Sequence, residues 1–339
     1  MKVLFIFEYL SSFRVDVLNE LSKRYEVTVI HSGYRGGQKA RLFIEEIVPM
    51  RKFGRFRWQY NIRSLSQYDV YVCMFDLGMP TYLRLIFGKR KKVLLYSIGY
   101  GSSLLGACLR RSIYHFFGGA IVYSEANAQQ LIWTGVSGEK VFSVDNTISI
   151  SSPIDSNIVR DNILFIGSNK DRKRVNELIH AFHRAVDSIA LDISLCLVGD
   201  GMSEKYQHLV DSLNLTERVI FSQGVFDDEK IAKIYSKAIA YVAPGHVGLS
   251  VLQAMGHGVP IVTSRNRPHG PEFLSITDNY NSFLYKDNNE LKNLLIWLCL
   301  NKQAVRLKGD KLKELYQSKY SIEKMADRFS EAIEYIRNA

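Results

Sequence analysis

The chain has 339 residues, and this length predicts two domains of roughly 150 residues each. Its four cysteines form no C-x-x-C pair, which argues against a zinc site or a disulfide framework and favours a reducing compartment. No apolar run approaches the roughly 18 residues that a membrane-spanning helix needs, and 47% hydrophobic and 23% charged residues are ordinary values for a globular protein.

The formal net charge of +10 lies almost entirely in the first half of the chain. Residues 1–150 hold 20 Lys or Arg and 11 Asp or Glu, whereas residues 151–339 hold 24 and 23. The excess gathers at 51–58, where basic and aromatic residues are interleaved, and at 89–92 and 110–111. Such segments suit an anionic membrane surface. The same composition would also suit nucleic acid or a solvated basic face.

The first 31 residues predict a strand, a helix and a second strand, at 3–7, about 14–23 and 26–31. The start, MKVLFIFEYL, is interpreted as a buried strand rather than a signal peptide, because Glu8 interrupts it and no small-residue cleavage site follows. This order predicts a parallel sheet with right-handed crossovers. The other elements expected before residue 150 are strands at 68–74, 92–96, 120–123 and 141–144 and helices at 104–117 and 124–133.

A Ser-rich segment at 146–160 has no helical face and is the predicted linker. Alternating strands and helices then resume. The expected strands are 163–166, 195–198, 219–221, 240–244 and 260–263, with helices around 175–182, 206–213, 231–235 and from 249, and a helical end from about 290. We therefore expect an α/β protein with two Rossmann-like domains, 1–150 and 151–320, whose parallel sheets face a central cleft. A C-terminal helix at 321–339 can pack back on the first domain.

Two loops of the second domain carry the candidate chemistry. The loop Gly167–Lys173 (GSNKDRK) places Arg172 and Lys173 at the start of a helix, where two cations indicate an anion that both can bind. A solvated surface turn would have the same composition. The second loop, Gly245–Gly248, brings backbone N–H groups to the carboxyl edge of the sheet, where phosphorylated ligands bind in such folds. The isolated Gly199-Asp200-Gly201 is typical of a tight turn.

Several segments together resemble one known family. They are FIGSNKDRKRVNELIHAF (165–182), LCLVGDG (195–201), RVIFSQGVFDDEKIAKIYSKAIAYVAPG (218–245) and VGLSVLQAMGHGVPIVTS (247–264). In order and spacing they resemble the donor-binding domain of family 4 retaining glycosyltransferases, group 1 type, which have the GT-B fold. IVYSEANAQQLIWTGVSGEKVFSVDNT (121–147) is similar to the segment that closes the acceptor domain of that family.

The resemblance implies a nucleotide-diphosphate sugar as donor, with its diphosphate against the Arg172–Lys173 loop and the helix that begins at Gly248. It implies no cofactor and no metal, and the sequence has no D-x-D pair that would hold a metal on a diphosphate. The positions that match catalytic roles are Lys173, Arg172, Glu272 and His246. The positions that match donor binding are Gly167, Ser168, Gly199, Gly224, Val225, Gly248, Leu249, Gln253 and His269, and those on the acceptor side are Arg14 and Gly99.

The chain departs from the family at four positions. Gly245 and Gln253 stand where the family has two glutamates eight residues apart. Ser168 replaces an arginine of the phosphate loop, and Ile98 matches an acceptor-domain histidine. Gln253 can still hydrogen-bond a ribose hydroxyl, but it supplies no charge.

Two interpretations of these departures remain. In one, the chain is a divergent, active subgroup in which His246, His269 and Glu272 contact the sugar. In the other, it binds a nucleotide sugar without transferring it. We favour an active glycosyltransferase, retaining and metal-independent, that acts on a glycan or lipid-linked acceptor in bacterial-type surface polysaccharide or lipopolysaccharide assembly. A nucleotide-sugar epimerase is the further alternative. The expected location is cytoplasmic, peripheral to the inner face of the cell membrane, with no nucleic-acid partner.

Overall fold

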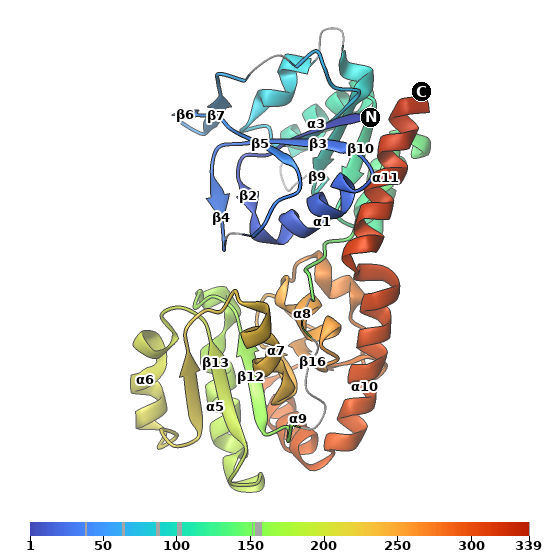
Figure 1. The fold of residues 1–339 in the computed structure, drawn as a ribbon. Helices are drawn as coiled ribbons and strands as arrows, with labels where there is room; N and C mark the ends of the chain where they lie inside the picture. The colour runs from blue at the N-terminus through green and yellow to red at the C-terminus, as the bar shows by residue number, and fades with distance from the viewer. Residues whose placement is uncertain are drawn as a thin grey trace. The chain divides into compact units, whose positions relative to one another are not determined.

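The computed structural model describes residues 1–37, 39–62, 65–85, 89–99, 104–150, 152 and 158–338. They form two compact units (Figure 1). Unit 1 contains Met1–Ile148 and Ser321–Ala339, and unit 2 contains Ser149–Tyr320. Part of the predicted linker, at 151 and 153–157, lies outside the described residues. None of the helices described is both long and apolar enough to cross a membrane.

Unit 1 is built on a seven-stranded parallel sheet with the strand order β11-β10-β9-β8-β1-β3-β5. The strands are β1 (Lys2–Ile6), β3 (Glu26–His31), β5 (Ile44–Ile47), β8 (Val70–Met74), β9 (Val93–Ser97), β10 (Gly119–Val122) and β11 (Val141–Ser143). The direction of the strand order reverses between β1 and β8. In open α/β sheets, ligands bind at the carboxyl end of this reversal.

The helices of unit 1 are α1 (Ser12–Ser22), α3 (Leu104–Phe116), α4 (Glu125–Trp133) and α11 (Ile322–Asn338). Short 3-10 helices are η1 (Pro80–Leu85), η2 (Arg90–Lys92) and η3 (Gly138–Lys140), and two small ribbons pair β2 (Leu10–Ser11) with β4 (Tyr34–Arg35) and β6 (Met50–Phe53) with β7 (Phe56–Gln59). Helix α11 buries Met325, Phe329 and Ile333 in the same core as β1 and α1. Since each such side chain contributes roughly 1.5–3 kcal/mol on burial, the end of the chain is firmly held on unit 1.

Unit 2 repeats this plan with six parallel strands in the order β14-β13-β12-β15-β16-β17. They are β12 (Asn162–Ile166), β13 (Ser194–Val198), β14 (Val219–Ser222), β15 (Ala238–Ala243), β16 (Ile261–Ser264) and β17 (Ser282–Tyr285). Here the order reverses between β12 and β15. The predicted class, α/β with two Rossmann-like domains, is confirmed.

The helices of unit 2 are α5 (Val175–Ala185), α6 (Met202–Ser212), α7 (Asp228–Ser236), α8 (Ser250–Gly256), α9 (Asn288–Leu300) and α10 (Lys302–Leu315). The shorter turns are η4 (Asp171–Lys173), η5 (Val186–Ser188), η6 (Pro271–Ser275) and the π-helical η7 (Tyr316–Tyr320). The core lies between the sheet and α5 and α9, and its largest buried side chains include Phe165 and Phe182. This packing fixes the ends of β12 and β15, from which the candidate site is built.

Candidate functional site

The loops that follow β12 and β15 are joined where the strand order of unit 2 reverses. The Nζ atom of Lys173 donates a hydrogen bond to the carbonyl oxygen of His246 at 2.7 Å. In return, the backbone N–H of His246 donates to the carbonyl oxygen of Arg172 at 2.9 Å. Lys173 is buried, with 7% of its surface exposed. The two loops therefore form one structure at the carboxyl edge of the sheet.

Gly245 makes this junction possible. A Cβ atom at this position would lie 2.0 Å from the carbonyl oxygen of Arg172 and 2.8 Å from the carbonyl carbon of Lys173. Real Cβ atoms do not approach backbone this closely, so the position accepts only glycine unless the loop after β12 moves. The missing glutamate at 245 therefore has a physical cause: the backbone of the neighbouring loop occupies the space of its side chain.

The pKa of the Lys173 ammonium group lies close to neutral pH. Burial, together with the neighbouring Arg172, lowers the pKa of Lys173 from 10.5 to about 8, and Glu272 opposes this shift. The ammonium group has two further donor hydrogens besides the one given to His246. Arg172 is exposed, and its guanidinium makes no hydrogen bond or ion pair within the described chain. Two adjacent cations with free donors make this a candidate anion site.

Backbone donors lie in the loop between β15 and α8. The N–H groups of Gly248 and Leu249 make no hydrogen bond with the residues that the structure describes. Helix α8 has only seven residues, so its dipole is small. The two N–H groups therefore contribute more to the binding of an anion than the dipole does. The side-chain amide of Gln253, half-buried on α8, likewise has no partner in the described part of the chain.

His246 and His269 differ in what they can still bind. Burial is the main cause that lowers the pKa of both imidazoles, and Lys173 adds to the effect, so both are neutral at pH 7. His269 donates from Nε2 to the carbonyl of Ser264 at 2.6 Å and accepts the N–H of Val247 at Nδ1, 3.3 Å away. The Nδ1 atom of His246 is buried and has no partner within the described residues. His246 is thus the histidine with a free ring nitrogen.

The glycines of the other predicted loops serve packing. A Cβ atom at Gly199 would lie 2.0 Å from the carbonyl oxygen of Gly167, so these loops touch backbone to backbone. The N–H of Gly224 is taken by the Asp200 carboxylate at 2.9 Å, which leaves it no hydrogen for a ligand. Ser168 is exposed and Val225 half-buried at the same edge.

The acceptor-side residues lie at the carboxyl edge of the sheet of unit 1. A cavity of about 280 Å³ opens beyond the ends of β1, β8 and β9, and Arg14 is among its lining residues. Its Nη2 atom donates to the Tyr123 hydroxyl at 2.9 Å. Gly99 is next to the cavity, but its N–H donates to Ser97 Oγ at 3.0 Å and its carbonyl accepts from Arg110 at 3.4 Å.

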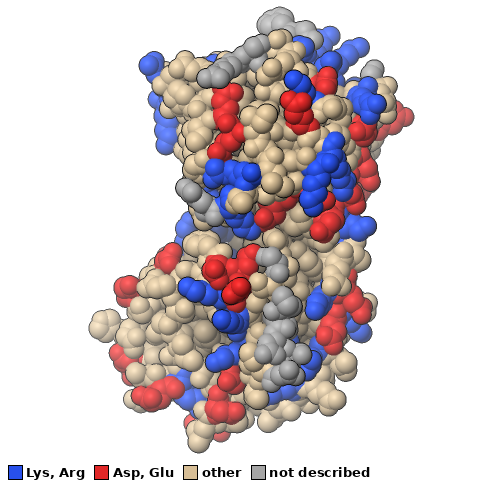
Figure 2. Space-filling view, in the orientation of Figure 1, with Lys and Arg blue, Asp and Glu red and all other residues tan. Residues whose placement is uncertain are grey.

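The sequence did not identify the other charged side chains of this cavity. They are Glu8, Arg35, Asp76 and Arg110. Arg57, one of the basic residues of the segment 51–58, bridges Glu8 at 2.7 Å and Asp76 at 2.6 Å. The basic surface of unit 1 is accordingly smaller than predicted, and Figure 2 shows Asp and Glu among the Lys and Arg of its visible face.

Comparison with known proteins gives a partial family match and a set of structures with the same fold. Residues 160–301 match the family model "Glycosyl transferases group 1". HepE of Anabaena, solved with UDP and glucose, has 16% identity and a TM-score of 0.71, covering 98% of this chain and 99% of that one. Sucrose-phosphate synthase of Thermosynechococcus elongatus has 16% identity and a TM-score of 0.71, covering 97% of each chain. The lipopolysaccharide outer core galactosyltransferase WaaB has 17% identity and a TM-score of 0.64, covering 98% and 99%.

No curated protein sequence is significantly similar to the chain. The fold is that of the GT-B glycosyltransferases. Within unit 2, residues 160–301 are similar to the group 1 glycosyl transferase model.

Proposed function

We propose that the chain is a glycosyltransferase that moves a sugar from a nucleotide-diphosphate donor to a glycan or lipid-linked acceptor. The observation that carries this proposal is the buried ammonium of Lys173, held against the His246 carbonyl beside the unpaired Arg172. In this proposal the donor diphosphate lies against these two cations. The N–H groups of Gly248 and Leu249 and the amide of Gln253 bind the rest of the nucleotide.

The transfer step needs this arrangement of charge. As the bond between the sugar's anomeric carbon and the diphosphate breaks, negative charge develops on the departing phosphate oxygen and positive charge on the sugar ring. The oxygen of the acceptor hydroxyl forms the new bond to the anomeric carbon, and its proton passes to the departing phosphate oxygen. Lys173, Arg172 and the two free N–H groups stabilise the developing negative charge, and donors fixed in advance do so without reorganisation. The reaction is proposed to be retaining and to need no metal.

The sugar itself is held without the glutamate at 245. His246 is the proposed partner of a sugar hydroxyl, because burial lowers its pKa and so favours the neutral imidazole, which can donate or accept a hydrogen bond. Glu272 lies close enough to Lys173 to affect its pKa and is 9% exposed, and it is the proposed carboxylate partner of the sugar. His269 positions the Val247 backbone through its Nδ1 atom.

A lipid-linked acceptor is favoured by the hairpin β6–β7. Its turn exposes Phe53 (63%) and Phe56 (45%) beside the exposed Lys52 and Arg55. Exposed aromatic rings with neighbouring cations are typical of attachment to anionic membrane surfaces. We therefore propose a cytoplasmic protein at the inner face of the membrane that acts in surface polysaccharide or lipopolysaccharide assembly. The solved complexes of HepE with UDP and UDP-glucose make UDP-sugars the first donors to test.

The test measures release of nucleoside diphosphate from a panel of nucleotide sugars, with and without a crude lipid-linked acceptor fraction. The proposal expects release that depends on the acceptor and that Lys173→Ala lowers at least tenfold, with sugar recovered in the glycolipid. Tight nucleotide binding with no release would favour the second candidate, a sugar-nucleotide-binding protein without activity. The space taken by the Arg172 backbone at Gly245 is the observation behind that candidate. An isomeric nucleotide sugar formed without acceptor would indicate an epimerase.

A further inference from the structure

The cavity at the carboxyl edge of unit 1 has an unbalanced set of charges. Its lining includes three arginines, Arg14, Arg35 and Arg110, and two carboxylates, Glu8 and Asp76. We propose that this cavity binds an acidic group of the acceptor, a phosphate or a carboxylate, through the three guanidiniums. That the ligand is the acceptor rests on the proposed function, whereas the anion site itself is inferred from the geometry of unit 1.

Both carboxylates of the cavity pair with one guanidinium, which offsets one of their two negative charges, so with the three other arginines the set keeps a net charge of +2. Arg57 from β7 donates from Nη1 to Glu8 Oε2 at 2.7 Å and from Nη2 to Asp76 Oδ2 at 2.6 Å. By contrast, Arg14, Arg35 and Arg110 form no ion pair within the described ranges of the chain. Three unpaired cations therefore line one cavity, and an anion is the ligand that balances them.

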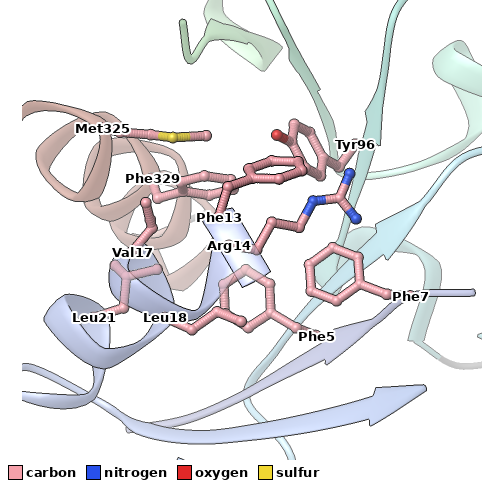
Figure 3. A pocket seen from close by; sticks show the side chains of 10 residues that line it. All are labelled: Phe5, Phe7, Phe13, Arg14, Val17, Leu18, Leu21, Tyr96, Met325 and Phe329. Carbon is pink, nitrogen blue, oxygen red and sulfur yellow. The ribbon is translucent and has the colours of Figure 1, made fainter. Parts of the chain in front are cut away.

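Aromatic rings lie against all three guanidiniums, and the backbone carbonyls of Phe75 and Gly99 also accept from Arg110 at 3.4 Å. Arg14 lies 4.6 Å from the ring centroid of Phe7 and 5.7 Å from that of Tyr96. Figure 3 shows its stem among apolar side chains and its guanidinium extending between these two rings. Arg35 lies 4.3 Å from the centroid of Tyr9, and Arg110 lies 5.0 Å from that of Phe75. A guanidinium stacked on an aromatic face keeps its N–H groups, which lie in its own plane, available to a carboxylate or a phosphate.

Two polar atoms of the residues that line the cavity, the Nε of Arg14 and the hydroxyl of Tyr96, are buried without a partner in the described part of the chain. The Nε atom of Arg14 is inaccessible to solvent and makes no hydrogen bond with any described residue. The cavity also lies where the strand order reverses between β1 and β8, the general ligand position of the fold.

The acidic group has two possible sources, the phosphate of a lipid carrier and the carboxylate of an acidic sugar, and matched probes distinguish them. The full chain is titrated with methyl β-glucuronide against methyl β-glucoside, and with farnesyl phosphate against farnesol, each with and without saturating UDP. We expect at least one acidic probe to bind at least tenfold more tightly than its neutral partner, equally with and without UDP. The acidic probe that binds identifies the source.

Variants of the arginines that line the cavity test whether these side chains bind the acidic probe. Arg35→Gln with Arg110→Gln should remove the preference for the acidic probe and leave UDP binding unchanged. Arg111→Gln, at the exposed neighbouring position, should retain both the preference for the acidic probe and the binding of UDP. Equal binding of acidic and neutral probes by the wild-type chain, which needs no variant, would overturn the inference. Competition between UDP and the acidic probe would also overturn it, because the cavity would then belong to the donor site. If UDP fails to bind while the acid preference persists, the proposed function fails and the anion site stands.

Discussion

The ammonium of Lys173 donates to the carbonyl oxygen of His246 at 2.7 Å, which links positions 73 residues apart. This bond and the return bond from the His246 N–H to Arg172 fasten the loop after β12 to the loop after β15. A ligand that binds the ammonium therefore meets both loops at once. The predictions below follow from this junction and from the charges around it.

Binding of a nucleoside diphosphate should weaken as pH rises from 7 to 9. The pKa of Lys173 is about 8, so roughly nine-tenths of the ligand-free protein carries the ammonium at pH 7 and about one-tenth at pH 9. If the diphosphate binds the charged form, its affinity should fall by about tenfold over this range in calorimetric titrations with UDP. Arg172→Gln removes a neighbouring cation that lowers this pKa, so the midpoint should move to higher pH. A flat profile in both proteins would contradict the assignment.

Adding one methyl group at Gly245 should damage the junction. The Cβ atom of Gly245→Ala would meet the Arg172 carbonyl oxygen at 2.0 Å, so the loop after β12 must move. We expect a loss of about 1–3 kcal/mol in the free energy of unfolding together with weaker UDP binding. Gly248→Ala is the matched control for stability, since no atom lies within 4 Å of its Cβ position. Equal denaturant midpoints for the two variants would show that the loops are not packed as described.

Protonation of His257 should destabilise unit 2 at acidic pH. Burial lowers its pKa from 6.5 to about 4, and its ring stacks on Tyr235 at 4.9 Å. Between these pH values the unfolded chain binds more protons than the folded one, so stability is lost as pH falls from about 6.5 towards 4. From pH 7 to pH 5 this group should account for about 2 kcal/mol of the lost unfolding free energy.

The matched variants for this effect are His257→Phe and His180→Gln. The phenyl ring keeps the stacking on Tyr235 and removes the titration, so His257→Phe should lose less stability than the wild type over the same pH range. His180→Gln, at an exposed position of the same unit, controls for the removal of a histidine as such. Identical pH dependence in the wild type and His257→Phe, measured by urea unfolding, would be evidence against a buried neutral imidazole.

Attachment to anionic vesicles should depend on the turn of the hairpin β6–β7. Each basic residue near such a surface contributes about 1 kcal/mol, so the triple change of Arg51, Lys52 and Arg55 to Gln should lower partitioning in a flotation assay at least tenfold. Arg57 is left unchanged because it pairs with Glu8 and Asp76. The matched control changes the exposed Lys230, Lys233 and Lys237 of unit 2 to Gln. Equal losses in the two triple variants would point to net charge rather than a membrane-binding hairpin.

The fold could be predicted because its central strands are apolar throughout. Ala238–Ala243 is fully buried along its length, and the apolar run alone marks it as a strand. By contrast, the edge strand Ile44–Ile47 reads IEEI, with both isoleucines exposed and both glutamates half-buried, and the hairpin β6–β7 is largely exposed. Such strands carry no apolar run, so the segment 44–59 gave no periodic signal.

For the candidate site, the sequence could indicate only those features that lie within one continuous segment. The loop with Arg172 and Lys173 and the departure at Gly245 were visible in the sequence. The contact that explains Gly245 is made by backbone atoms of Arg172, and no side-chain pattern reports it. The same holds for Arg57, whose carboxylate partners are 49 and 19 residues away in the chain. Contacts of this range depend on the sheet order.

The most direct measurement of the central claim is a calorimetric titration of UDP into three proteins at pH 7: the wild type, Lys173→Ala and Lys170→Ala. Hydrogen bonds to charged groups contribute about 1.5–3 kcal/mol, so Lys173→Ala should weaken binding at least tenfold. Lys170, exposed in the same loop, should be replaceable with less than a twofold change. If Lys173→Ala binds UDP as tightly as the wild type does, the diphosphate does not lie against this ammonium and the proposed donor site is wrong.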